Sequence, residues 1–238
     1  MTEMLIPPLQ RRARSVSAEL AAHFEKLITS GQLKPGERLP SERDLAASMQ
    51  VSRASLRQAM FELESKNLIS RRHGSGSVVT EPTAGATELY GELSEANVEL
   101  SNATELRDIV EPRIAGFAAL RATDSNLLQL EQILAQSNEN LDAEESLRLD
   151  KEFHLLLAHA AQNPLLVTLC DMTSDWTQSI RSLSHATRAG RRVSIDGHEE
   201  IFRAVVAHDV DAATAAMELH LHAVREIIHH VHQNPEAL

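Results

Sequence analysis

The chain has few of the features that mark secreted or membrane proteins. It holds a single cysteine, Cys170, so it cannot form an internal disulfide. No stretch approaches the roughly 18 to 20 consecutive apolar residues of a membrane-spanning helix, and the N-terminus lacks the basic and apolar segments of a signal peptide. These absences exclude a disulfide scaffold and a membrane span, and we expect a cytoplasmic protein with no membrane partner.

Aromatic residues are also scarce, at 3 % of the chain, and alternating β-branched residues occur only near residues 77–80. Strands therefore have little support, whereas apolar residues at helical spacing recur along most of the chain. The length of 238 residues and the hydrophobic content of 42 % suffice for one large or two modest cores. We predict a mainly α protein.

The net charge of −11 conceals an asymmetry between two parts of the chain. Residues 1–80 hold twelve lysines and arginines against eight acidic residues, whereas residues 81–238 hold eleven against twenty-six. Residues 81–87 mix proline, glycine and small residues where the charge changes sign. The sequence thus predicts domains at 1–80 and 88–238 joined by a linker at 81–87, and only the first domain attracts phosphate groups.

The N-terminal part has the order helix, short helix, helix and glycine-tipped hairpin. Apolar residues at spacings of three and four predict a helix over 16–28, and Ser41 and Ser52 are placed to cap a second and a third helix. Residues 68–80 alternate enough for two short strands around a tip that contains Gly74. This order indicates a winged helix-turn-helix.

The third helix carries side chains that suit DNA. Arg53 and Arg57 lie one turn apart, away from the apolar stripe, and Ser52 and Ser55 occupy the first turn. A guanidinium group fits a guanine edge or a phosphate, and hydroxyls at a helix start bind phosphate. The plainer interpretation is that the arginines only solvate the helix, but the order of elements around them favours double-stranded operator DNA as a partner.

Three segments, LPSERDLA at 39–46, VSRASLRQA at 51–59 and GSG at 74–76, resemble the winged helix-turn-helix of the GntR family of bacterial transcription regulators. The chain departs from the family pattern at Gln50, where glycine is usual, and at Ala54, where a polar residue is common. Gln50 must therefore tolerate the backbone geometry of the turn. The residues that the resemblance implies for operator contact are Arg43, Ser52, Arg53, Ser55, Arg57, His73 and Gly74.

Beyond the linker the sequence predicts helical segments and no strands. Their expected ranges are 88–100, 104–122, 124–140, 143–161, 164–189, 195–208 and 211–233. We therefore expect an all-α bundle in the C-terminal part.

Four polar residues fall on or beside the apolar stripes of these helices. Asp150 and His154 lie on neighbouring turns of one helix, His198 shares an apolar stripe, and His220 interrupts another. Each histidine taken alone is more often a core residue bonded to a carbonyl or a carboxylate. An aspartate and three imidazoles that converge in a helical bundle instead form a site for a divalent metal.

The Asp-x-x-x-His motif and the intervals to the two later histidines resemble the metal-binding effector domain, of FCD type, of FadR-type GntR regulators. The resemblance implies a homodimer and an antiparallel bundle in which Asp150, His154, His198 and His220 hold one divalent ion at the floor of a pocket. Zinc suits imidazole and carboxylate ligands best, with nickel and manganese as alternatives.

Arg107 lies on the apolar side of its predicted helix, where a buried guanidinium group needs an anion. That anion is either an internal acid such as Glu111 or, as the resemblance implies for the Glu-x-Arg pattern, the carboxylate of an effector. Arg113 is a second inward candidate, and Trp176 forms either one pocket wall or part of the core. His185 is among the histidines with no convergent partner in the sequence.

We hypothesise that a small carboxylate, such as a hydroxy acid or a sugar acid, binds Arg107 and an open metal position and thereby changes operator affinity. Two alternatives stay open. The ion itself can be the signal, or the site can activate water as in a metal-dependent hydrolase, with Glu152 or Glu199 near a ligand. The DNA-binding part favours a regulator, in particular a repressor, over an enzyme.

Overall fold

The computed structural model describes residues 15–72, 76–80 and 98–233. Within these ranges it contains ten helices and one two-stranded sheet, so the predicted mainly α fold is confirmed. The linker predicted at 81–87 and most of the helix predicted at 88–100 lie outside the described residues. The domain boundary therefore stays a prediction.

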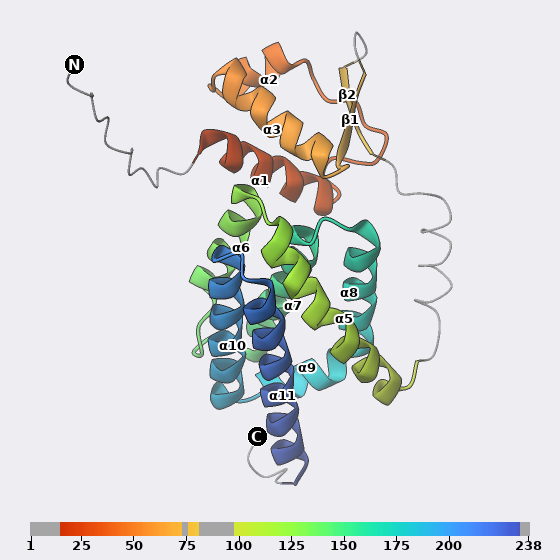
Figure 1. Cartoon of the computed structure of the whole chain (residues 1–238), viewed down its shortest axis with the longest axis vertical. Helices are drawn as coiled ribbons and strands as arrows, with labels where there is room; N and C mark the ends of the chain where they lie inside the picture. Colours follow the sequence, from red (N-terminus) through yellow and green to blue (C-terminus); the bar gives the residue numbers. More distant parts are fainter. Residues whose placement is uncertain (1–14, 73–75, 81–97, 234–238) are drawn as a thin grey trace, which may run out of the picture.

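The N-terminal part has the predicted winged helix-turn-helix arrangement, and its antiparallel sheet forms the wing (Figure 1). Ser41 and Ser52 cap their helices by accepting hydrogen bonds from the backbone N–H groups of Asp44 and Ser55, at 3.2 and 3.0 Å. The elements are α1 (Val16–Thr29), α2 (Glu42–Ser48), α3 (Arg53–Ser65), β1 (Ile69–Arg72) and β2 (Gly76–Val79).

Gln50 forms the turn between α2 and α3 in a left-handed backbone conformation, with φ at +55°. This conformation costs an L residue about 1 kcal/mol, because its Cβ approaches the following carbonyl oxygen. The turn therefore demands the geometry that glycine adopts most easily, and Gln50 tolerates it at that cost.

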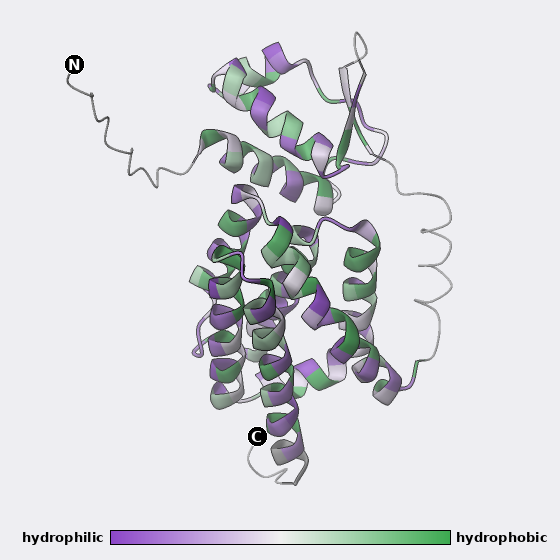
Figure 2. Ribbon diagram, viewed as in Figure 1, coloured by the Kyte–Doolittle hydropathy of each residue, from purple (hydrophilic) through white to green (hydrophobic). Residues whose placement is uncertain are grey.

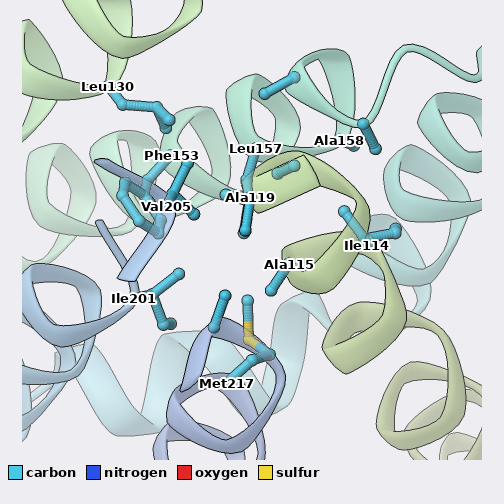
Figure 3. Packing of buried hydrophobic residues seen from close by; sticks show 14 of the residues in the cluster. Ile114, Ala115, Ala119, Leu130, Phe153, Leu157, Ala158, Ile201, Val205 and Met217 are labelled. Atoms are coloured by element: carbon cyan, nitrogen blue, oxygen red, sulfur yellow. The ribbon is translucent and has the colours of Figure 1, made fainter. Parts of the chain in front are cut away.

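The C-terminal part is a bundle of helices, and each helix carries both hydrophilic and hydrophobic residues along its length (Figure 2). Figure 3 shows Ala115, Phe153, Ile201 and Met217, from four different helices, pointing into one interior. No helix of the described ranges is long and apolar enough to cross a lipid bilayer. The elements are α5 (Leu100–Arg121), α6 (Asp124–Gln136), α7 (Ala143–Ala160), α8 (Pro164–Trp176), α9 (Gln178–His185), α10 (Arg188–Val206) and α11 (Val210–Gln233).

The segment predicted as one helix over 164–189 contains a break, so that prediction is wrong. α8 ends at Trp176 and α9 begins at Gln178. Between them, the hydroxyl of Thr177 donates a hydrogen bond to the carbonyl of Thr173 at 2.6 Å. Such bonds from a side chain to the preceding turn bend helices. The break redirects α9, whose polar residues then face the interior.

Three other helix ends differ from the predicted ones. α5 begins at Leu100 rather than near 104, α6 ends at Gln136 rather than near 140, and α10 begins at Arg188 rather than near 195. Thr187 caps α10, because its side chain accepts a hydrogen bond from the N–H group of Gly190 at 3.1 Å. The first turns of α10 are rich in arginine and lack the apolar spacing that marks a helix in the sequence.

Candidate metal centre and DNA-binding surface

The residues expected to contact DNA lie on α2 and α3, which are farther from the bundle than α1 (Figure 1). The exposed basic side chains are those of Arg43, Arg53 and Arg57. Ser52 and Ser55 stand at the start of α3 with their hydroxyl oxygens 2.8 Å apart. His73 and Gly74 lie outside the described residues. The other five predicted residues therefore lie on α2 and at the N-terminal end of α3.

The structure brings Asp150, His154, His198 and His220 together in the interior of the bundle, from α7, α10 and α11. Each offers one ligand atom, and the four atoms lie within 4.8 Å of one another. Nε2 of His154 lies 3.2 Å from Nε2 of His198, which lies 3.3 Å from Oδ1 of Asp150. Ligand atoms of one metal ion stand about 3 Å apart. The cluster therefore suits a single cation.

His220 gives the most direct indication of a metal-binding role. Both of its ring nitrogens are buried and have no hydrogen-bond partner among the described residues. A buried imidazole in this state costs on the order of 1 to 3 kcal/mol. Its place depends on Gly197 of α10, because a Cβ atom there would lie 2.5 Å from Nδ1 of His220. The fold thus accommodates a ring that the protein alone does not satisfy.

Glu111 belongs to the site, although the sequence indicated it only as one possible partner of Arg107. Its Oε2 lies 3.0 Å from Nδ1 of His154, the nitrogen that faces away from the cluster. The pair is close, but its angle is not that of a hydrogen bond in this structure. A carboxylate on this side of a metal-binding imidazole is the usual partner that orients its ring. The other oxygen, Oε1, accepts hydrogen bonds from Arg107 at 2.8 Å and from Arg181 at 3.0 Å.

Three further side chains hold Asp150, and none of them was predicted from the sequence as part of the site. Arg181 pairs with Oδ2 of Asp150, and the hydroxyl of Ser194 donates a hydrogen bond to Oδ1 at 3.0 Å. Nε2 of His185 lies 3.3 Å from the same oxygen, and its Nδ1 is bonded to the hydroxyl of Ser146. The prediction that His185 has no convergent partner is therefore wrong.

The protonation states suit metal binding. Burial raises the pKa of Asp150, but the Arg181 guanidinium and the hydrogen bonds from His185 and His198 together outweigh burial, so the pKa lies well below its ordinary value. Burial lowers the pKa of His198 to about 4, and it also lowers the pKa of His154 and of His220. The three imidazoles are neutral at pH 7, which is the form whose lone pair binds a metal.

The buried charges around the metal centre balance one another. The carboxylates of Asp150 and Glu111 face the guanidinium groups of Arg107 and Arg181. A cation at the histidines would therefore add its full charge to a neutral set of side chains. Such a site attracts an anion.

A pocket of about 510 Å³ lies between α5, α9 and the C-terminal half of α11. Arg107 is in its wall with Thr177 and Arg225, so the inward position predicted for Arg107 is confirmed. The same guanidinium forms the internal ion pair with Glu111. Among the described residues, the wall includes none of the four clustered ligands. The pocket meets the cluster through Glu111, which contacts both Arg107 and His154.

The other two effector candidates lie elsewhere. Arg113 is exposed, so its predicted inward position is wrong. The buried face of α5 passes through Glu111, Ile114 and Ala115, and Arg113 falls on the opposite side of the helix. Trp176 is partly buried and does not line the pocket, whereas the next residue, Thr177, does.

Comparison with protein families gives two matches that together cover most of the chain. Residues 16–79 match the bacterial regulatory proteins of the gntR family, and residues 102–223 match the FCD domain.

Two relatives align with most of the chain. The HTH-type transcriptional repressor NanR of Edwardsiella tarda is 32 % identical over 227 residues, which cover 91 % of this chain and 86 % of that protein. The Uxu operon transcriptional regulator of Escherichia coli is 32 % identical over 223 residues, covering 87 % and 84 %. A solved structure of Streptococcus agalactiae GntR is 27 % identical, covers 88 % of this chain and 99 % of that chain, and has a TM-score of 0.45.

Proposed function

Because the chain belongs to the GntR family of bacterial regulators and carries an FCD domain, we propose that it is a repressor controlled by a small carboxylate and a bound divalent metal. Family membership makes it a DNA-binding transcriptional regulator, not an enzyme. Its relatives named NanR are repressors, which supports repression here. We place its action in the cytoplasm, where operator DNA is available. The observation that carries the proposal is the buried cluster around His220, whose ring nitrogens have no hydrogen-bond partner in the part of the chain that the structure describes.

The residues that would hold the ion are Asp150, His154, His198 and His220. Zinc fits this set best, and nickel or manganese fit the same ligand types. A divalent ion there supplies positive charge in a dry interior. Glu111 orients one imidazole, and Arg181 and Ser194 orient the carboxylate, so the protein presents the ligand atoms already aligned.

The effector site that we propose is the pocket at Arg107. A volume of about 510 Å³ suits a small organic acid. The carboxylate of such a ligand would compete with Glu111 for the Arg107 guanidinium, and Glu111 also contacts His154. Glu111 therefore links the effector pocket to the metal centre. This link holds whether or not the effector also touches the ion.

Calorimetry against a panel of hydroxy acids and sugar acids tests this proposal. We expect at least one acid to bind the zinc-loaded protein, and its affinity to fall at least about tenfold after chelation, since a nearby positive charge is lost. Arg107→Met should reduce binding further, with Arg188→Met, an exposed arginine, as the control. Equal affinity before and after chelation would contradict a role for the metal in effector binding.

A second candidate function follows from the pocket wall, which contains none of the four metal ligands among the described residues. In this case the ion itself is the signal, and no organic ligand is needed. The two functions separate in one assay. If zinc or a chelator alone changes operator affinity fully and no carboxylate adds to the change, the protein is a metal sensor.

Operator binding is proposed to depend on the arginines of α3. Arg57→Ala should weaken binding to a duplex selected from a random library by about 1 to 3 kcal/mol, the discrimination of a bidentate arginine–guanine contact. Lys26→Ala, an exposed residue of α1, is the control and should leave affinity unchanged. Gel-shift titration at fixed salt measures both. Unaltered affinity in Arg57→Ala would show that this side chain only solvates the helix.

We propose that the protein acts as a homodimer, since helix-turn-helix regulators read paired half-sites. The outer face of α5 supports this: Ile109 and Leu120, three turns apart, are 63 % and 61 % exposed, with Phe117 beside them. Exposed apolar surfaces of this kind mark interaction sites. Ile109→Glu with Leu120→Glu should give a monomer in sedimentation equilibrium. Leu219→Glu, which changes an exposed leucine of α11, should leave the dimer intact.

A further inference from the structure

A buried polar cluster joins the winged helix-turn-helix to the bundle, and we call it the interdomain cluster. α1 lies directly on α6, at the end of the bundle nearest the N-terminal part (Figure 1). The N-terminal part contributes Glu25 from α1, Glu62 from α3 and Lys66 just after α3, and α6 contributes Ser125 and Gln129.

Every member of the interdomain cluster is bonded across or along this contact. Nζ of Lys66 donates hydrogen bonds to Oε2 of Glu25 at 2.9 Å and to the hydroxyl of Ser125 at 2.8 Å. It also lies 3.1 Å from Oε1 of Glu62. The hydroxyl of Ser125 donates to that Glu62 oxygen at 2.5 Å, and Nε2 of Gln129 donates to Oε2 of Glu25 at 2.9 Å.

The contact between the domains depends on α6, because the interdomain cluster carries an excess negative charge that side chains of α6 stabilise. Two carboxylates share one ammonium group, and the side chains of Lys66 and Glu25 are only 3 % and 2 % exposed. The remaining negative charge is stabilised by neutral donors from Ser125 and Gln129. Buried ion groups of this kind add little net stability, because desolvation offsets attraction, but they demand one geometry. Small displacements of α6 therefore decide whether the domains stay docked.

α6 is in turn packed on α7, the helix that carries two of the proposed metal ligands. A residue of α7 also interacts with the interdomain cluster. His159, on the last turns of that helix, interacts electrostatically with Glu25 and with Lys66. α7 thus carries Asp150 and His154 of the metal centre and packs against α6, the helix that contacts the DNA-binding part.

We propose that the interdomain cluster is the docking contact through which the C-terminal domain sets the position of the DNA-binding part. Release of the contact frees the winged helix-turn-helix, and retention holds it as in this structure. Docking stands on the contacts above, whereas its control by metal rests on the proposed function.

Hydrogen exchange of the full chain tests the docking. Ser125→Ala with Gln129→Leu removes both donors from α6 and leaves the core of each domain intact. The amides of Val16–Thr29 should then exchange at least about tenfold faster, since the three hydrogen bonds that join these two side chains to the N-terminal part are lost. Gln132→Leu, an exposed change on the same helix, should leave the exchange as in wild type.

A second variant guards against a loss of folding. Ser125→Glu favours the start of α6, where an acidic residue suits the helix dipole, yet adds a third carboxylate to the interdomain cluster. It should speed exchange in α1 while α6 stays protected. If α1 exchanges at the wild-type rate in both variants, the interdomain cluster does not dock the domains, and the proposal is wrong.

Control by metal is tested with zinc alone. In wild type, zinc should slow exchange in α7 and in α1, and the ratio of affinities for a selected duplex with zinc and with chelator should differ from one. In Ser125→Ala with Gln129→Leu, zinc should still protect α7, but the ratio should fall toward one. No zinc protection of α7 in wild type refutes the metal site instead. Protection of α7 with a wild-type ratio in the variant refutes the coupling.

Discussion

Replacing Arg181 with methionine should lower the free energy of unfolding of the metal-free protein by about 3 to 5 kcal/mol, the usual cost of removing one partner from a buried ion group. Arg181 is 1 % exposed and is the guanidinium between Asp150 and Glu111. Without it, two carboxylates remain buried near each other with only Arg107 to balance them. Urea unfolding followed by the fluorescence of the single tryptophan, Trp176, measures the change in the C-terminal part.

The matched control is Arg188→Met, since Arg188 pairs with Glu139 at the surface and its side chain is 67 % exposed. Its effect should stay below about 1 kcal/mol. Zinc should reduce the cost of Arg181→Met, because a cation next to Asp150 replaces part of the lost charge. A loss as small as that of the control would mean that the buried carboxylates do not depend on Arg181.

Replacing His220 with alanine should abolish tight metal binding without destabilising the metal-free protein. Loss of a partner that only orients a ligand already costs about ten- to a hundredfold in metal affinity, so loss of a ligand should cost more than a hundredfold. In the metal-free protein the change removes two buried nitrogens for which residues 15–72, 76–80 and 98–233 offer no hydrogen-bond partner, and this offsets the lost packing. This opposite response of the two states separates a metal ligand from an ordinary core histidine.

His222→Ala supplies the control, because His222 is exposed on the same helix and lies two residues further along. Elemental analysis after dialysis, and competition with a chromogenic chelator, should give one metal per chain for wild type and for His222→Ala, and far less for His220→Ala. Zinc at a thousandfold excess over its dissociation constant should add about 4 kcal/mol to the stability of the first two proteins alone. Equal metal content in all three would exclude His220 as a ligand.

Much of this molecule could be predicted from the sequence because the signals were local or supported by a family resemblance. The capped helices around Ser41 and Ser52 follow from neighbouring residues, and the structure has both caps. The convergence of His198 and His220 with α7 is a long-range contact. The spacing of the residues alone did not decide whether these side chains converge. The resemblance to a metal-binding domain predicted that they do.

The side chains that surround the proposed metal ligands were not predictable in the same way. Arg181 and His185 lie one turn apart, a spacing that places both on one face of α9. That face is polar yet buried, so apolar periodicity assigns it to solvent. The unpredicted break at Thr177 also changed the direction of the helix. An arginine and a histidine at this spacing in a segment poor in apolar residues were the available signal.

Arg113 was misplaced for a different physical reason. α5 is apolar on its outer side as well, where Ile109, Phe117 and Leu120 are exposed. A helix with apolar residues on both sides gives no clear phase, so periodicity cannot tell which side faces the core. The position of Glu111 as the most buried acid of this helix resolves the phase only once the fold is known.

The close approach at Gly197 has a mechanical consequence. It brings α10 against α11 at the level of His220, well inside the 24 residues of α11. A tilt of about 5° around that point would shift the distal end of the helix, about 20 Å away at 1.5 Å per residue, by roughly 2 Å, while atoms at the pivot hardly move. The histidine cluster therefore lies close to the pivot of this tilt. A ligand bound beside the distal end of α11 would move that end while the metal-binding atoms stay together.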